Sequence, residues 1–158
     1  MTCKSTAGVG RDVAAFYAIG CPETKPAEAA FKRLGMCRSK STNINWNTTD
    51  ATADTSPDQT TESLVTTKEK TISIDGVSRG DDVNNQSALF NHIDKPETTN
   101  NQPYVWVRLV NNVMGITIEG CYLITSLSEE YPYDDVCTWS IEGTSAGEIT
   151  RTPIPVTP

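Results

Sequence analysis

Apolar and polar residues alternate along several stretches of the chain, and a period of two residues is typical of half-buried antiparallel β-strands. The segment 43–47 alternates asparagine with isoleucine and tryptophan, and the segment 68–75 alternates isoleucine with threonine, serine and aspartate. Asp75-Gly76 ends the second segment, and Asp-Gly is a strong turn dipeptide. The pattern therefore predicts two paired strands, with a turn at Asp75-Gly76 after the second.

Further segments extend the β-prediction to most of the chain. They are 12–20, 104–110, 114–127, 134–143 and the proline-rich end 147–155. Val105, Val107 and Leu109 fall on one face of their segment, which predicts a strand with one side against the core. The segment 22–35 is short and ends at Gly35, so a helical turn at 26–31 and a loop or irregular edge strand are equally expected there.

Only residues 81–93 favour a helix. Apolar residues from Val83 to Ile93 recur at roughly helical spacing, and Asp81 or Asp82 is suited to cap the N-terminus. One short helix among many strands predicts a mainly β protein, an antiparallel β-sandwich or small barrel.

A long polar insert interrupts the first pair of strands. Residues 47–67 contain eight threonines and four acids, and no lysine or arginine occurs between Lys40 and Lys68. An insert of this length inside a hairpin either binds something or is disordered. Its composition buries too little apolar surface to hold it alone, so we expect disorder in the monomer and order on contact with another subunit.

Composition indicates a single domain over residues 1–158, with an N-terminal arm (1–11) and an extended C-terminal tail (152–158). Hydrophobic residues make up 37% of the chain, and no apolar run approaches the roughly 20 residues that cross a bilayer. The five cysteines form no C-x-x-C pair, so free core thiols in a cytosol are expected rather than disulfides or a zinc site.

Charge is distributed unevenly along the sequence. Residues 1–40 carry a net charge of +4, residues 41–67 carry −4, and residues 109–150 carry −7 with no basic residue. Unlike faces favour head-to-tail association between copies of a chain, provided that the segregation survives folding.

The sequence offers few parts for catalysis, so no enzyme activity, cofactor or metal is expected. The one histidine, His92, lies in the predicted helix, and no phosphate-binding loop or nucleophile motif is present. The acidic cluster at 129–135 lacks the spacing of a calcium loop and is expected to be a solvated turn. Arg79-Gly80-Asp81 matches an adhesion tripeptide by chance more readily than by function.

The order of elements resembles the major tail tube protein of long-tailed, siphovirus-type bacteriophages, which is similar in fold to the tube protein of type VI secretion. The segments that carry the resemblance are Asn45–Asp54, Glu62–Gly76 and Thr138–Ile154. The resemblance implies a structural virion protein of the phage tail, made and assembled in the host bacterial cytoplasm. It also implies hexameric rings whose strands line an inner barrel, and rings that stack into a tube for DNA ejection.

The partners implied by the resemblance are further copies of the chain, the tail tip, tape measure and tail terminator proteins, and double-stranded DNA that passes without specific binding. An acidic lumen would keep DNA from sticking, and the candidates for it are Glu119, Glu129, Glu130, Asp134, Asp135 and Glu142. The insert would reach the next ring and pair with its basic N-terminal region. The candidates for this contact are Asp50, Asp54, Asp58, Glu62, Lys4 and Arg11.

Two alternatives stay open at this point. One is another virion component of the same fold, a tail terminator or connector. The other is an Ig-like adhesion or carbohydrate-binding module that uses the acidic and aromatic residues at 129–135.

Overall fold

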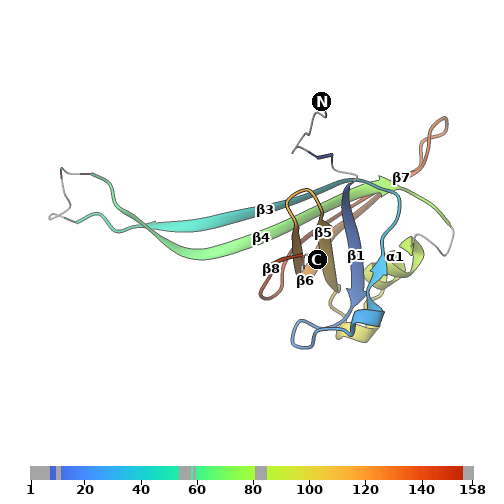
Figure 1. Ribbon diagram of the computed structural model, residues 1–158, viewed down its shortest axis with the longest axis horizontal. Coiled ribbons are helices and arrows are strands. Elements are labelled where there is room, and N and C mark those ends of the chain that lie inside the picture. Colours follow the sequence, from blue (N-terminus) through green and yellow to red (C-terminus); the bar gives the residue numbers. More distant parts are fainter. Residues whose placement is uncertain (1–7, 10–11, 54–57, 59, 81–84, 155–158) are drawn as a thin grey trace, which may run out of the picture.

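Antiparallel strands form one sheet in the computed structural model, which describes residues 8–9, 12–53, 58, 60–80 and 85–154. The strand order is β2-β1-β5-β6-β7-β4-β3, and β8 pairs with β6 (Figure 1). The strands are β1 (Val13–Ile19), β2 (Lys32–Arg33), β3 (Cys37–Asp50), β4 (Ser63–Val77), β5 (Tyr104–Asn111), β6 (Ile116–Glu130), β7 (Thr138–Ser145) and β8 (Thr150–Pro153). The prediction of a mainly β, antiparallel protein is confirmed.

Strand β6 joins two parts of the sheet. Its first half pairs with β5 on one side and with β8 on the other. Its second half pairs with β7, and the register shifts between Ile124 and Ser126. One part of the sheet is therefore β2-β1-β5, and the other is β7-β4-β3, with β6 common to both.

The core lies between the inner faces of these two parts. Alternate residues of β5, of β7 and of the body part of β4 are buried there, with Ala15 and Tyr17 from β1, as the alternation predicted. The central members are Ala15, Tyr17, Val105, Val107, Leu109, Ile72, Ile74, Trp139 and Ile141. The packing is that of a sandwich, and the sheet is not closed into a barrel.

One α-helix, α1 (Gln86–Asp94), covers one end of the core. It contributes buried Leu89, and the Phe90 ring packs edge-on against Trp139 with 5.4 Å between ring centroids. The helix begins later than predicted, because Asn85 has a left-handed backbone (φ 57°) and starts it without a side-chain cap. The predicted caps at 81 and 82 lie outside the described residues.

The predicted turn at Asp75-Gly76 is wrong, because both residues lie inside β4. Asp75 pairs with Ser140, and Gly76 pairs with Cys37 on one side and Trp139 on the other. A Cβ atom on Gly76 would lie 2.3 Å from the Met36 carbonyl oxygen and 2.8 Å from the Trp139 ring. The glycine is therefore required by close packing across three strands and not by a turn.

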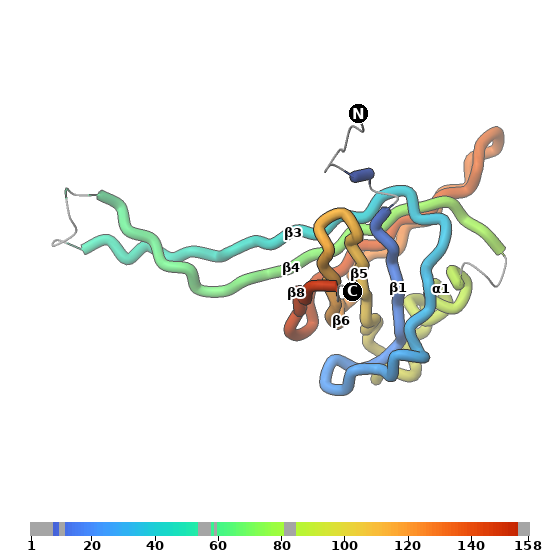
Figure 2. Tube along the Cα trace, viewed as in Figure 1, coloured from blue at the N-terminus to red at the C-terminus, as the bar shows by residue number. Residues whose placement is uncertain are grey.

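The predicted polar insert at 47–67 is also corrected. Strands β3 and β4 stay paired as far as Asp50 and Ser63, so both ends of the insert belong to a long hairpin (Figure 2). Threonine and asparagine carry this pairing through backbone hydrogen bonds, which need no apolar side chains. Residues 51–62 connect the strands, and 54–57 and 59 are outside the described residues. In the segment 22–35, a turn of 3-10 helix (Glu28–Ala30) and the short edge strand β2 match two of the interpretations left open.

Candidate assembly surfaces

The distal part of the β3–β4 hairpin leaves the body as a two-stranded ribbon, which we call the arm (residues 43–70). Strand β4 pairs with β7 only from Thr71 to Val77, so β3 and β4 have only each other beyond this point. At roughly 3.3 Å per residue, the eight residues 43–50 extend about 25 Å from the body. A two-stranded hairpin is marginally stable by itself, so this shape favours contact with another molecule.

The two faces of the arm differ in chemistry. Directly paired residues point to the same side, and Ile44 pairs with Lys70, Trp46 with Lys68 and Thr48 with Val65. This apolar–basic face (Ile44, Trp46, Val65, Lys68 and Lys70) continues the inner face of the sheet, which carries buried Ile72 and Ile74 in the body. The opposite face carries asparagine, threonine and Glu69, with Leu64 near the tip.

Large apolar side chains on the arm are exposed to solvent. Trp46 is 56% exposed, and the Lys68 ammonium lies 5.2 Å from the centre of its ring. Where the arm leaves the body, a pocket is lined by Ile44, Lys70 and Arg151 together with Tyr122 and Ile149. Lys70 ties the base of the arm to the body, since its ammonium donates a hydrogen bond to the Ile149 carbonyl at 2.9 Å.

Two edges of the second sheet part have no strand beside them among the described residues. Strand β3 pairs only with β4, and β6 pairs only with β7 from Ser126 to Glu130. Unpaired backbone groups on such edges are ready to pair with another strand. The body therefore offers one open edge on each side of β6-β7-β4-β3.

The outer face of β6-β7-β4-β3 is polar apart from Val77 and Leu123. Register places thirteen polar side chains on it: Ser39, Ser41, Asn43, Thr71, Ser73, Asp75, Ser126, Ser128, Glu130, Thr138, Ser140, Glu142 and Thr144. Its charged members are all acidic, although Arg38 borders it in a shallow groove of about 310 Å³. Two lumen candidates, Glu130 and Glu142, lie here beside Asp75, which sequence reasoning assigned to a turn. The alternation of Asp75 with buried Ile72 and Ile74 is the sequence signal that its side chain lies on the outer face.

Other lumen candidates lie elsewhere. Asp134 and Asp135 belong to the exposed connection between β6 and β7, together with Tyr131 and Tyr133, whereas Glu129 lies near the end of β6 and pairs with Trp139. We call residues 129–136 the acidic–aromatic turn. Tyr133 is fully exposed, and Val136 is 47% exposed. The turn lies at the opposite end of the molecule from the arm, at the orange loop beside β7 in Figure 1.

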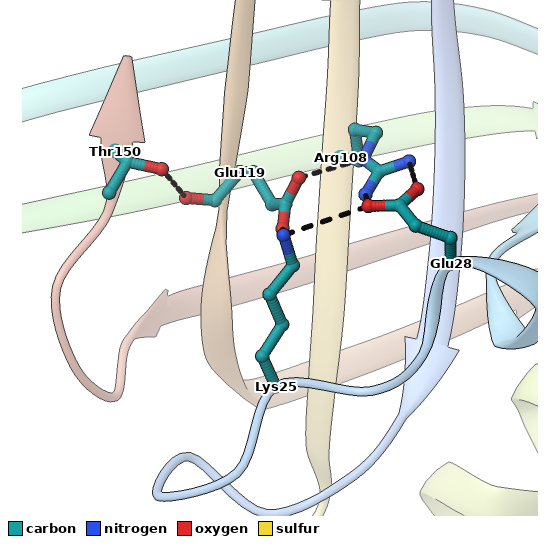
Figure 3. A network of polar contacts seen from close by, with 5 residues as sticks. All are labelled: Lys25, Glu28, Arg108, Glu119 and Thr150. Atoms are coloured by element: carbon teal, nitrogen blue, oxygen red, sulfur yellow. Dashed lines mark hydrogen bonds and ion pairs between the residues drawn. The ribbon is translucent and has the colours of Figure 1, made fainter. Parts of the chain in front are cut away.

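Glu119 is held in an ion-pair network on the body (Figure 3). The Arg108 guanidinium reaches Glu119 and Glu28 at 2.8 Å each, and the Lys25 ammonium reaches Glu119 at 2.8 Å. Burial raises the pKa of Glu119, but hydrogen bonds from Lys25 and Arg108 outweigh it and leave the pKa below its ordinary value. This carboxylate is therefore neutralised locally and ties the 22–31 connection to β5 and β6.

Asp50, one of the predicted inter-ring acids, ends strand β3 at the arm's tip. Asp50 accepts hydrogen bonds from the backbone N–H and hydroxyl of Thr52, which lower the pKa of its carboxyl group. Asp58 and Glu62 follow in the connection between β3 and β4, and both are exposed. Their predicted partners, Lys4 and Arg11, and also Asp54, lie outside the described residues.

The remaining candidate residues have structural partners. His92 is buried, and its Nε2 lies 2.9 Å from the Tyr104 carbonyl oxygen. Buried Gln86 donates to the Gly35 and Val77 carbonyls and accepts from the Arg79 N–H. The cysteines described, Cys21, Cys37, Cys121 and Cys137, are free thiols. The described residues contain no metal-ligand cluster, and none of their helices is long and apolar enough to cross a membrane.

Comparison with solved structures shows the same fold in assembled tails. The tail of an empty gene transfer agent particle, solved with C6 symmetry, matches with a TM-score of 0.70 and 17% identity over 92% of this chain and 99% of the other. The SPP1 tail tube matches with a TM-score of 0.63 and 11% identity over 93% and 80%. The baseplate of the anti-feeding prophage matches with a TM-score of 0.63 and 8% identity over 97% and 100%.

Among curated proteins, none matches the sequence significantly. The family model described as phage tail tube protein matches residues 22–151, which include β2 to β7, the arm and both open edges. The polar sheet face and the arm thus fall within the matched region, and the chain belongs to the phage tail tube protein family.

Proposed function

We propose that this chain is the structural subunit of a tail tube, in which hexameric rings stack around a channel that conducts DNA during ejection. The observation that carries the proposal is the pair of open edges on β6-β7-β4-β3. These four strands alternate in direction, so β3 runs opposite to β6. A second copy in the same orientation therefore brings its β6 beside β3 as an antiparallel partner, and further copies repeat the contact until a ring closes.

The polar outer face would line the channel of such a ring. Serine and threonine hydroxyls cover it, and Asp75, Glu130 and Glu142 give it negative charge. Repetition around the ring multiplies this charge, and like charges on wall and DNA disfavour adhesion during transit. The six-fold symmetry of the gene transfer agent tail supports a ring of six.

The role requires no catalysis and no cofactor, and the subunit's partners follow from its position in the tail. These are copies of itself, the tape measure protein inside the tube, and the tail tip and terminator proteins at its ends. The protein would reside in the virion tail after synthesis and assembly in the host cytoplasm.

Negative-stain electron microscopy of the purified chain tests the proposal. Long tubes with a central channel are expected. A persistent monomer at high protein concentration would contradict it, and rings that never stack would indicate a terminator.

The lumen assignment has its own test. Asp75→Lys and Glu142→Lys, combined, reverse charge on the outer face without changing residues 129–136, and the resulting tubes should retain added DNA in cosedimentation. The matched control reverses Asp94 and Glu97, which are exposed and lie off this face. Equal DNA retention by both variants would remove the outer face from the lumen.

A further inference from the structure

The apolar–basic face of the arm has no second layer in the molecule that carries it. In the body, the same side of β4 is covered by β5 and β6 through the core, and Ile74 is 1% exposed. On the arm, Ile44, Trp46 and Val65 are 42%, 56% and 55% exposed. A partner for this face must supply apolar surface and negative charge.

The acidic–aromatic turn has the complementary chemistry. Tyr131, Tyr133 and Val136 present apolar surface, and Glu129, Glu130, Asp134 and Asp135 surround it with carboxylates. The ion pairs among the described residues join Lys25 and Arg108 to Glu28 and Glu119, so neither Lys68 nor the carboxylates of the turn have one there. The charges on both surfaces are therefore available to a partner outside the monomer.

The position of the two surfaces indicates which copy makes the contact. The arm contains the C-terminal end of β3. The turn follows the C-terminal end of β6, which lies beside the N-terminal end of β3 in the sheet. Figure 1 shows them at opposite ends of the longest axis. Copies side by side in a ring keep their turns away from each other's arms, whereas copies stacked along the strands bring an arm to a turn.

We propose that the apolar–basic face of the arm docks on the acidic–aromatic turn of a second copy of this chain in the next ring. The inference rests on the proposed tube function and specifies its stacking contact. The central contact places Trp46 and Lys68 against Tyr133 and the Asp134-Asp135 pair. This differs from the predicted pairing of the arm's acidic tip with a basic N-terminal region, because the basic charge lies on the arm itself, at Lys68 and Lys70.

Charge reversal tests the contact on the full-length chain. Lys68→Glu should reduce sedimentable tubes about tenfold, which corresponds to about 1.4 kcal/mol in the stacking equilibrium, because it sets like charges against the turn. Rings should persist, since the sheet edges are unchanged. Asp134→Lys with Asp135→Lys should reduce tubes similarly, and the combination with Lys68→Glu should restore them.

Glu69→Lys is the matched control, because residue 69 neighbours Lys68 on the opposite face of the arm and should stack normally. A second pair, Trp46→Ser against Asn45→Ser, removes apolar surface from one face only. Circular dichroism checks that every variant is folded. Normal tubes from Lys68→Glu and Trp46→Ser, or no recovery in the combination, would overturn the inference while leaving the tube function intact. A wild-type chain without rings or tubes would instead overturn the function on which it rests.

Discussion

Strands β3 and β4 run through both the body and the arm, but their apolar side chains are buried only in the body. Along β4, Ile74 is 1% exposed in the body, whereas Leu64 is 61% exposed near the arm's tip. Hydrogen bonding between β3 and β4 continues through both regions, so backbone pairing alone does not bury side chains. The body gains a second layer from its own chain, and the arm can gain one only from another molecule.

This difference separates folding from assembly. The free energy of folding comes from apolar surface in the body, at about 25 cal/mol per Å² buried. Apolar surface on the arm is still in water in the monomer and releases its free energy only when copies meet. Substitutions of apolar residues should therefore lower the stability of the monomer in the body part of β3 and β4, but not in the arm.

Matched isoleucine substitutions make the largest test of the comparison. Ile74→Ala should lower the free energy of unfolding of the monomer by about 2–5 kcal/mol, because it opens a cavity in the core. Ile44→Ala, on the same side of the sheet but in the arm, should change it by no more than about 0.5 kcal/mol. Urea denaturation of both variants measures this, and equal losses would show that the arm belongs to the folded core.

A smaller effect is expected at Gly76, where β4 lies between β3 and β7. Gly76→Ala should destabilise the monomer by about 1–3 kcal/mol, because the new methyl group meets the Met36 carbonyl and the Trp139 ring. Gly147→Ala is the control, since its Cβ would meet no atom within 4 Å. Thermal melting compares the two, and similar midpoints would mean that the three strands at Gly76 shift apart at little cost.

The smallest effect comes from pH. Because the pKa of Glu119 is lowered in the folded chain, its stabilising contribution is present above its ordinary value of 4.5 and is lost as the pH falls through the lowered value. Between pH 7 and pH 3, Glu119→Gln should therefore lose up to about 1 kcal/mol less stability than the wild type. Glu97→Gln, which is exposed and makes no ion pair among the described residues, serves as the control and should follow the wild type.

Local alternation predicted the parts of the fold in which each strand has one buried face. The segments around Val105, Leu109 and Trp139 were identified because apolar residues recur at every second position. The arm was predicted as strand at 43–47 and 68–70, but not at 48–50 and 63–67, where threonine and serine dominate and carry no such period. Gly76 was assigned to a turn because its real constraint, the Trp139 ring, comes from residues far away in the sequence.

The sequence also could not show which surface each acidic candidate occupies. Sequence counting placed Glu119, Glu130 and Asp134 in one acidic region, but strand β6 changes partners along its length and its ends serve different surfaces. Glu119 is paired with Arg108, Glu130 lies on the polar sheet face, and Asp134 is in the end turn. Charge totals along a chain carry no information about which face of a sheet a residue occupies.

The open edge of β3 also has a consequence for how the protein survives in solution before it assembles. A long unpaired strand is a template for any extended chain, including misfolded copies. Bulges interrupt this edge near Arg38 and between Asn47 and Thr48, and few apolar side chains accompany it. Irregular spacing and polar composition disfavour the flat, dry stacking of amyloid. These features protect the edge from misfolded copies, while its backbone groups remain available to a correctly oriented neighbour.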